Sequence, residues 1–448
     1  MRRALIVVLS VVLLSFALTS TASAATEAQK LSAILNGLAH LDTVQCKTAG
    51  STFGSWGTTQ CGGGYGDAFT GAALFAFVSQ QAKWPAGALA ATYATDVTNG
   101  VNYLLATAST QTVSTNDNAV NICPGGSGSC QAIYWNVCGE QTYCTGFVAT
   151  ALDTYALTKG VGNVATASGP LAGLTWTQIA QGITNAYAAG QATTKDGNNN
   201  GGWRYTIPSN DGADMSTAQW GAIAVGYDES VGAVTPPGVK PGLQTWLAYD
   251  ILSGAACYEG GTSGFCGIGP TNSENGAWLV SNSYAGGNNP ANAIAFLNTN
   301  WKTSINATWY GNFGHPYAMW SSYKGLEASI GLTDNSHIGN LMTTCGAPSN
   351  LPGSGICNWW EDYNEWLVNV TPRSTDANTN MYWPGASEWP DPLSTSVFTA
   401  IIGAAALPNS ITQTTPASVP AISRWGLVAL GILLVTFAAM KLRRPHTA

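Results

Sequence analysis

The stretch Gly201-Gly-Trp-Arg-Tyr205, followed closely by Asp214-Met-Ser-Thr-Ala-Gln-Trp-Gly-Ala222, decides the fold of this chain. Its first part is rich in glycine and predicts a turn. Its second part opens on an acidic residue and then continues with small and apolar residues on nearly every side. A helix of this composition is buried all round, whereas an amphipathic helix shows one face to water. The stretch therefore predicts an inner helix that other helices enclose.

Segments of the same kind recur along the chain. The other predicted inner helices cover residues 67–77, 143–155, 275–280, 315–326 and 392–407. More amphipathic helices are expected near residues 27–40, 87–107, 171–190, 240–254, 290–301 and 358–370. Sustained strand-type alternation is missing from the sequence. Repeat units that cannot bury their own faces gain stability by stacking, and closing the array protects its ends. We therefore predict an all-α fold, an α/α toroid of about six helix pairs.

The opening stretch also resembles the repeat of the squalene cyclase and prenyltransferase superfamily. In that superfamily Gly-Gly-Trp precedes an inner helix that begins with Ser/Thr and Gln-Trp, and Tyr382-Trp-Pro-Gly with Ser394-Thr-Ser-Val-Phe-Thr-Ala is a looser copy. The resemblance implies the toroid fold. It also makes a terpenoid cyclase-like enzyme an alternative function, although Asp211-Gly-Ala-Asp214 is the nearest approach to the family's acidic Asp-x-Asp-Asp motif. The Asp, Cys and His zinc set of the prenyltransferases finds no counterpart.

Both ends of the chain carry export features. Arg2 and Arg3 precede an apolar stretch and the small residues 22–24, which is typical of a signal peptide over residues 1–24. The ectodomain is then expected over 25–407, with a linker at 408–420. Residues 421–448 contain an apolar run that ends at Met440 and a basic tip, which predicts a transmembrane helix with a cytoplasmic C-terminus before any processing. We therefore expect an exported protein anchored at the membrane or cell surface.

The C-terminal tail suggests a sorting enzyme as a partner. Val419-Pro-Ala-Ile-Ser-Arg-Trp-Gly426 resembles bacterial sorting signals of the type Ile-Pro-Thr-Leu-Ser-Glu-Trp-Gly, which an exosortase-type transpeptidase reads. The match holds at Pro420, Ser423, Trp425 and Gly426 and fails at the other four places. A simple membrane anchor is the alternative interpretation.

Composition restricts the partners and predicts disulfides. Only 9 % of the residues are charged and the net charge is −7, so a basic groove for nucleic acid is not expected.

The even number of cysteines, 10, in an exported chain indicates disulfides. Close spacing favours Cys257 with Cys266 and Cys345 with Cys357. The intervals from Cys46 to Cys61 and from Cys123 to Cys138 are both fifteen residues, which suggests repeated cysteine loops. The middle four stay open between Cys123–Cys138 with Cys130–Cys144 and Cys123–Cys130 with Cys138–Cys144.

Cys138-Gly-Glu-Gln141 offers a different use for one cysteine. These four residues resemble the internal thioester of complement and macroglobulin proteins, whose thioester domain is also an α/α toroid. There the cysteine sulfur is acylated by the glutamine side chain and captures a surface nucleophile. The resemblance implies a thioester-containing, adhesin-like surface protein, with a disulfide at Cys138 as the competing interpretation.

Candidate catalytic residues follow from the predicted ring. Its inner helices run parallel, so residues near their N-termini gather at one mouth. These residues are Asp67, Glu140, Asp214, Glu274, His315 and Asp391. Carboxylates at helix starts also cap free backbone N–H groups, which is the competing interpretation for each one. Two acids on one rim would suit glycosidic chemistry.

Aromatic side chains are expected to bind sugar rings at this mouth, together with one arginine. The candidates are Trp203, Arg204, Tyr205, Trp220, Trp278, Trp320, Trp383 and Trp389. Asp196, Asn198 and Asn200 resemble the start of a calcium loop, but Ile207 stands where the last carboxylate would be, and an ordinary Asn/Gly turn is the alternative. We therefore predict binding or processing of an extracellular polymer, a carbohydrate, at an acidic and aromatic mouth, with calcium as the one cofactor considered.

Overall fold

The computed structural model describes residues 24–412, apart from residues 127, 261–265, 267–268, 288, 303–308, 310, 343–357 and 387. The chain divides into two units, Met1–Gln413 and Thr414–Ala448. The predicted signal peptide up to residue 23, the Cys345–Cys357 pair and the C-terminal anchor all lie outside the described residues. Among the helices that are described, none combines the length and the apolar character needed to cross a bilayer.

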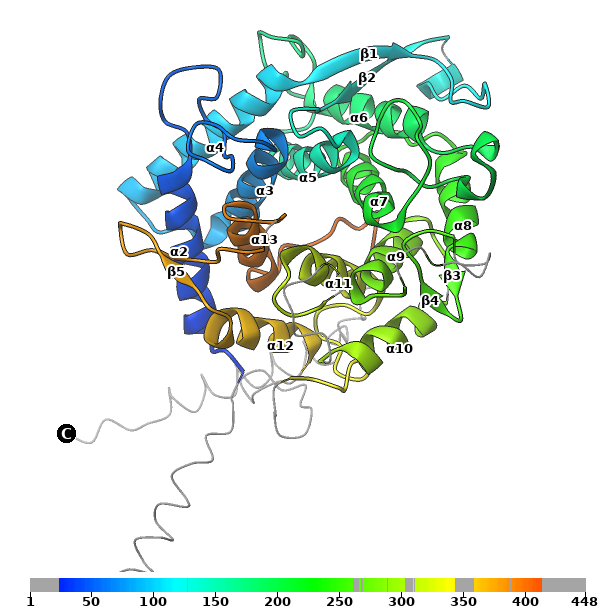
Figure 1. The fold of residues 1–448 in the computed structure, drawn as a ribbon. Coiled ribbons are helices and arrows are strands. Elements are labelled where there is room, and N and C mark those ends of the chain that lie inside the picture. The colour runs from blue at the N-terminus through cyan, green and yellow to red at the C-terminus, as the bar shows by residue number, and fades with distance from the viewer. Residues whose placement is uncertain are drawn as a thin grey trace, which may run out of the picture. The chain divides into compact units, whose positions relative to one another are not determined.

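The described part of the chain is mostly helical, and its helices lie in two concentric rings (Figure 1). The inner ring contains α3 (Gly66–Ser79), α5 (Gln141–Lys159), α7 (Met215–Ser230), α9 (Asn272–Tyr284), α11 (Pro316–Ser329) and α13 (Leu393–Ile402). The outer ring contains α2 (Glu27–Val44), α4 (Ala88–Thr107), α6 (Trp176–Gly190), α8 (Val239–Tyr249), α10 (Ala291–Asn300) and α12 (Trp359–Glu365), which continues as a π-helical turn, η5 (Trp366–Val370). Each inner helix packs against the next, and α13 packs against α3, so the inner ring is closed.

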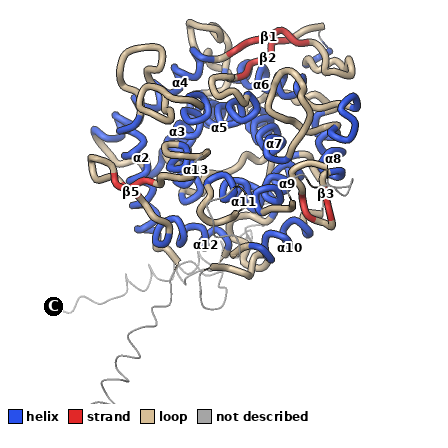
Figure 2. Tube along the Cα trace, in the orientation of Figure 1, coloured by secondary structure: helices blue, strands red, loops and turns tan. Residues whose placement is uncertain are grey.

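Strands are confined to short hairpins (Figure 2), which the sequence did not reveal. The pairs are β1 (Ser109–Val113) with β2 (Cys130–Tyr134), β3 (Ile251–Leu252) with β4 (Ala255–Ala256), and β5 (Ser374–Thr375) with β6 (Met381–Tyr382). The prediction of helix up to residue 254 is therefore wrong beyond Tyr249, where β3 follows. The helix expected from residue 171 begins at Trp176, because Thr175 forms a capping box with Gln178.

Glycines let the inner helices approach each other closely. A Cβ atom added to Gly325 of α11 would lie 2.3 Å from the carbonyl oxygen of Gly276 in α9. A Cβ atom added to Gly71 of α3 would lie 2.8 Å from the carbonyl carbon of Phe147 in α5. Real Cβ atoms do not fit at such distances. Small residues on these helices thus serve the packing of one inner helix against the next.

A recurring tryptophan joins outer helices to inner ones, and we call this contact the tryptophan latch. The indole N–H of Trp56 donates to the Leu41 carbonyl, and that of Trp135 to the Leu104 carbonyl, both at 2.8 Å. The indole N–H of Trp203 donates to the Tyr187 carbonyl at 2.8 Å, and that of Trp383 to the Leu367 carbonyl at 3.1 Å. Each acceptor lies three residues before its outer helical segment ends, where the regular intrahelical hydrogen bonds stop. The Leu41 carbonyl also accepts from the Gln45 backbone N–H at 3.2 Å, and the Leu104 carbonyl from the Thr107 hydroxyl at 3.4 Å. The latch thus gives a carbonyl at the end of an outer helix a hydrogen-bond donor. It also fixes the position of the chain segment that leads to the next inner helix.

A threonine on the following inner helix completes each latch. The backbone N–H of Trp56 donates to the Thr70 hydroxyl, and that of Trp135 to the Thr145 hydroxyl, both at 3.0 Å. The backbone N–H of Trp383 donates to the Thr395 hydroxyl at 3.2 Å. At Trp203 the direction is reversed, because the Thr217 hydroxyl donates to the Trp203 carbonyl at 2.6 Å. Trp278 forms a variant from within α9, since its indole donates to the Leu247 carbonyl at 3.0 Å. Trp203, Trp278 and Trp383 were expected to bind sugars, and the structure shows them making these contacts instead.

The C-terminal ends of the inner helices are covered by residues 403–412, which we call the closing segment. The Lys324 side chain and the Tyr323 hydroxyl donate to the Ala405 carbonyl at 2.7 and 3.2 Å, and Ser283 donates to the Ile411 carbonyl at 2.6 Å. Glu327 accepts from the Leu407 backbone N–H at 2.8 Å. Ile411 is almost fully buried. The expectation of a linker from residue 408 is therefore wrong for residues 408–412, because buried polar groups of the ring need their carbonyls.

Disulfides connect neighbours in the sequence. The described pairs are Cys46–Cys61, Cys123–Cys130, Cys138–Cys144 and Cys257–Cys266. The expected pair Cys257–Cys266 is thus present, and Cys46 pairs with Cys61. In the middle group the structure has the nearest-neighbour pairing, since Cys130 begins β2 at the end of the hairpin where the connecting loop, which contains Cys123, returns to the strands.

The latch leads to a prediction about stability. Trp135→Phe should lower the free energy of unfolding by about 1–3 kcal/mol, because the Leu104 carbonyl then loses its indole donor at 2.8 Å and keeps only the Thr107 hydroxyl at 3.4 Å. Trp246→Phe is the matched control, because Trp246 is equally buried and its indole N–H has no hydrogen-bond partner. Urea denaturation of the two variants measures the difference. Equal losses in both would show that ring volume, and not the hydrogen bond, matters.

Candidate functional site

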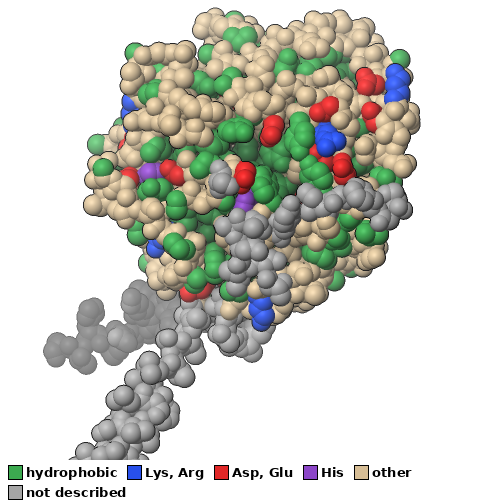
Figure 3. Space-filling view, in the orientation of Figure 1, with side chains coloured by type: hydrophobic (Ala, Val, Ile, Leu, Met, Phe, Trp, Pro, Cys, Tyr) green, Lys and Arg blue, Asp and Glu red, His purple; other side chains and the backbone are tan. Residues whose placement is uncertain are grey.

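A pocket of about 310 Å³ opens at the N-terminal ends of the inner helices. Its aromatic wall includes Tyr65, Phe69, Tyr143, Phe147, Tyr317 and Trp389, and its acidic residues are Glu140, Glu274 and Glu388. In the space-filling view, hydrophobic side chains gather around the hollow at the centre of the ring, with acidic side chains beside them (Figure 3). The volume lies at the lower end of the range for small-molecule sites.

Glu274 is the most deeply buried acid of the pocket. It lies in the first turn of α9, where its backbone N–H donates to the hydroxyl of the N-cap Thr271 at 3.2 Å. Its side chain is almost inaccessible, and its Oε2 atom has no hydrogen-bond partner. Burial, reinforced by the charges of Asp214 and Asp250, raises the pKa of Glu274 well above the ordinary value. Burial thus favours the neutral, protonated form of Glu274, which is the form that can donate a proton.

Glu140 lines the same pocket as Glu274, and Asp214 lies near enough for its charge to affect both glutamates. Glu140 immediately precedes α5, and partial burial together with the charge of Asp214 raises its pKa. Asp214 is fully buried as the N-cap of α7, where it accepts from the Thr217 backbone N–H at 3.0 Å and from the Ser216 hydroxyl at 2.6 Å. Asp214 thus acts as a helix cap whose charge disfavours ionisation of both glutamates.

A second polar wall comes from the loops before α7 and α9. The hydroxyls of Tyr205 and Tyr258 lie 2.6 Å apart, and both side chains line the pocket. Arg204 places its Nε atom 3.7 Å from Asp214 and its Nη1 atom 3.8 Å from Glu259. Burial raises the pKa of both tyrosines, so they are neutral and can donate or accept hydrogen bonds.

Trp389 lies at the centre of the aromatic wall. Its ring centroid is 5.6 Å from that of Phe147, 5.4 Å from that of Tyr317 and 6.4 Å from that of Trp309. Trp220 stacks behind it, with centroids 6.5 Å apart, and is fully buried. Such rings offer flat apolar faces of the kind that pack on sugar rings.

The structure brings together only some of the residues proposed from the sequence. Glu140, Glu274, Tyr205 and Trp389 line the pocket, while Asp214, Arg204 and Trp220 lie against its lining residues. Trp320 lies deeper, stacked on Trp220 at 6.4 Å and covered by Lys324.

Three further candidates have structural contacts outside the pocket. Asp67 is buried and accepts from the Thr107 hydroxyl and the Val137 backbone N–H, both at 3.0 Å, and burial raises its pKa to about 6. Asp391 forms an ion pair with His40. His315 is fully buried beside Trp309, burial lowers its pKa to about 4, and neither ring nitrogen has a hydrogen-bond partner. His315 is therefore a neutral side chain behind the aromatic wall.

Cys138 and Gln141 are not joined to each other in the structure. The sulfur of Cys138 pairs with Cys144, and the Gln141 side chain accepts from the Ile207 backbone N–H at 3.0 Å. The disulfide is thus the interpretation that the structure contains. Cys138 still contributes to the pocket wall.

Two of the proposed calcium residues, Asp196 and Asn198, lie in a 3₁₀ segment, Thr194–Asn199, and Asn200 follows it as the C-cap residue. Asp196 accepts from the Thr193 backbone N–H at 2.7 Å and from the Asn210 amide at 2.6 Å. Within the described residues, no group of three or more His, Cys, Asp and Glu side chains could hold a metal ion. The asparagines belong to the turn that leads towards Trp203.

The pocket also contains residues that sequence reasoning missed. They are Tyr65, Phe69, Tyr143, Phe147, Tyr258 and Trp309, with Glu388 beside them. Tyr143 and Phe147 are one turn apart on α5 and could have been found from helical spacing. Tyr258 and Trp309 come from loops, so only the closed ring brings them to the pocket.

Comparison of the chain with protein-family models, with curated proteins and with solved structures finds no match.

The raised pKa of Glu274 leads to a prediction about pH dependence. Its burial is compatible with folding while the carboxyl is neutral, so stability is lost as pH rises from about 4.3, the ordinary glutamate pKa, through the raised value. Glu274→Gln should therefore be more thermostable than the wild type at pH 9 by about 2 °C or more, with a smaller difference at pH 5. Differential scanning fluorimetry tests this. Glu365→Gln, on the partly exposed side of α12, should leave the pH profile of the wild type unchanged.

Proposed function

We propose that the two rings are an α/α toroid and that the pocket binds and hydrolyses an extracellular carbohydrate polymer. The observation that carries the proposal is the presence of a neutral acid, Glu274, and a second carboxyl group, Glu140, in one aromatic pocket. Hydrolysis of a glycosidic bond uses such a pair, one member as proton donor and the other as base or nucleophile.

Each residue of the pocket has a role in this mechanism. Glu274 protonates the oxygen of the bond to be cleaved, because burial keeps its carboxyl neutral. Glu140 is less buried, and its carboxylate activates water or stabilises the positive charge that develops on the sugar. Trp389 and Tyr317 hold the sugar ring, while Tyr205 and Tyr258 form hydrogen bonds with its hydroxyls.

The closed far end of the ring favours the end of a polymer as the substrate. Phe75, Tyr227 and Trp320 pack edge to face inside the ring, and the closing segment covers the helix ends beyond them. A chain entering the pocket therefore has no path through the ring. Acidic residues in the pocket disfavour an anionic polymer, so we expect a neutral terminal sugar.

The surroundings support action outside the cell. The described disulfides suit an oxidising compartment, and the signal peptide expected over residues 1–24 agrees with export. Anchoring through residues 421–448, with or without an exosortase-type enzyme, would keep the protein at the membrane or cell surface. These parts of the proposal rest on the sequence.

Oligosaccharide assays test the function. Cellohexaose, xylohexaose, mannohexaose and maltohexaose are incubated with the ectodomain, and release of monosaccharide is measured alongside binding by calorimetry. Glu274→Gln should lower turnover at least about 100-fold while the Kd changes less than about threefold, since the amide keeps the shape but cannot donate the proton. Glu365→Gln is the matched control and should keep full turnover.

Two results would contradict the proposal. One is the lack of binding of any of these oligosaccharides, with reducing ends free or blocked, by the wild-type ectodomain. The other is full turnover by Glu274→Gln, which would remove this residue from the mechanism. Turnover of an isoprenoid alkene in place of a sugar would instead support the cyclase-like alternative.

A further inference from the structure

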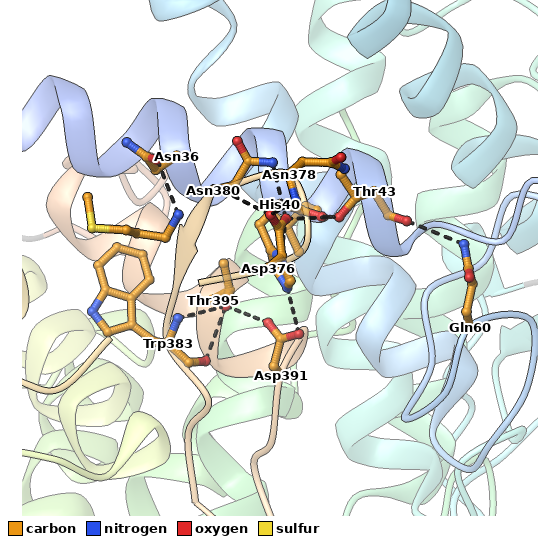
Figure 4. A network of polar contacts seen from close by, with 12 residues as sticks. Asn36, His40, Thr43, Gln60, Asp376, Asn378, Asn380, Trp383, Asp391 and Thr395 are labelled. Atoms are coloured by element: carbon orange, nitrogen blue, oxygen red, sulfur yellow. Dashed lines mark hydrogen bonds and ion pairs between the residues drawn. The ribbon is translucent and has the colours of Figure 1, made fainter. Parts of the chain in front are cut away.

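His40 lies between two carboxylates at the junction of the first and last parts of the ring (Figure 4). Its Nδ1 atom is 3.0 Å from Asp376 Oδ2, and its Nε2 atom is 2.8 Å from Asp391 Oδ2. The imidazole stacks on Tyr382, with centroids 4.0 Å apart and an interplanar angle of 6°. Since His40 is on α2 and its partners lie more than 330 positions later, the contact joins chain segments that are distant in sequence.

The geometry fixes the charge of the ring. A neutral imidazole has one N–H donor and one bare nitrogen, whereas the imidazolium donates from both nitrogens. Both nitrogens of His40 face carboxylate oxygens, so only the imidazolium satisfies both contacts. Hydrogen bonds from His40 and Asn380 and from the Asn378 backbone outweigh burial and lower the pKa of Asp376 to about 2, so this carboxylate is ionised. Burial alone would lower the pKa of His40, but Asp391 and Asp376 raise it.

Asp391 connects this ion pair to the pocket. Its Oδ1 atom accepts from the Thr395 hydroxyl at 2.5 Å, and its backbone N–H donates to the Pro384 carbonyl at 3.1 Å. Between Pro384 and Asp391 the chain turns back on itself, and Ala386 and Trp389 exchange backbone hydrogen bonds at 3.2 and 3.1 Å. The tip of this turn carries Glu388 and Trp389, which line the pocket. The turn is thus held at its base by His40.

We propose that His40 is a positioning residue whose protonated ring holds this turn in place, so that a ligand binds in the pocket only while His40 is charged. The part of the proposal that concerns a ligand rests on the proposed function. The part that says His40 keeps the turn in place does not. His40 itself does not line the pocket.

The direction of the pH dependence follows from the groups around the ring. Asp376 and Tyr382 face it from the β5–β6 hairpin, Asp391 faces it from the turn before α13, and the α13 member of the network is the uncharged Thr395. Because the pKa of His40 is raised, the stabilisation that His40 gives the turn is complete below about pH 6.5, the ordinary histidine pKa. This stabilisation is lost as the pH rises through the raised value. Above that value, a bare nitrogen faces a carboxylate and the turn loosens.

Hydrogen exchange of the turn tests the proposal without any ligand. Exchange at the hydrogen-bonded amides of Ala386, Trp389 and Asp391 is measured by mass spectrometry at pH 6 and pH 9 and corrected for intrinsic rates. In the wild type, protection should fall at least about tenfold at pH 9. His40→Gln should lack this protection at both pH values, because a neutral amide cannot replace two charged contacts.

Two further variants separate charge from packing. Asp391→Asn allows a neutral His40 to donate to Asp376 and accept from the new amide, so its turn should stay protected at both pH values. His337→Gln is the matched control, because His337 is half exposed and pairs with Asp334 far from this network. Equal protection of wild type and His40→Gln at both pH values would overturn the proposal, as would an unchanged pH effect in Asp391→Asn.

Oligosaccharide binding then tests whether the fixed position of the turn matters for ligand binding in the pocket. If one of the four oligosaccharides binds, its Kd should rise at least about tenfold in His40→Gln at pH 6, and should rise with pH in the wild type but not in Asp391→Asn. If the exchange result holds and no oligosaccharide binds, the positioning role stands and the carbohydrate function fails. If binding occurs without this pH dependence, the function stands and the positioning role fails.

Discussion

The indole hydrogen bond to the last turn of an outer helix is the contact on which the two rings depend. A helix end leaves carbonyl groups without partners inside the helix, and burying one without a donor costs about 1–3 kcal/mol. The latches at Trp56, Trp135, Trp203 and Trp383 each satisfy such a carbonyl while the neighbouring backbone meets a threonine of the next inner helix. Each tryptophan therefore donates a hydrogen bond to the end of an outer helix and also positions the start of an inner helix.

Few charges are present, and several of them lie inside the ring, where burial determines their state. Glu274 is kept neutral in the pocket, while Lys324 and Glu327 pair with each other and with the closing segment. His40 remains charged between two carboxylates at the junction of the ring. The few buried charged groups thus differ in their surroundings, because each one has a different set of partners.

The candidate site was predicted in part. Parallel inner helices place their N-termini at one end, and this reasoning found Glu140 and Glu274 in the pocket. The same reasoning also selected Asp67 and Asp391, because a residue at a helix start can face the pocket or a neighbour, and spacing along one helix does not distinguish them. Tyr258 and Trp309 could not be predicted, since their loops reach the pocket only through the packing of other repeats.

By itself, the sequence determined the alternation of buried and amphipathic helices, because periodicity and composition along one segment report how many of its faces meet water. It also indicated disulfides between cysteines close in sequence, but left the pairing of the middle four open, and it showed the acidic, aromatic character of the protein. Only the tertiary structure decided which tryptophans form latches, which acids face the pocket and how residues 403–412 close the ring. The pocket and the closing segment depend on contacts between segments distant in sequence, such as that of Ser283 with Ile411, and these exist only after the ring has closed. The latches join segments that are nearer in sequence, but which tryptophan meets which carbonyl depends on how an outer helix packs against the inner one.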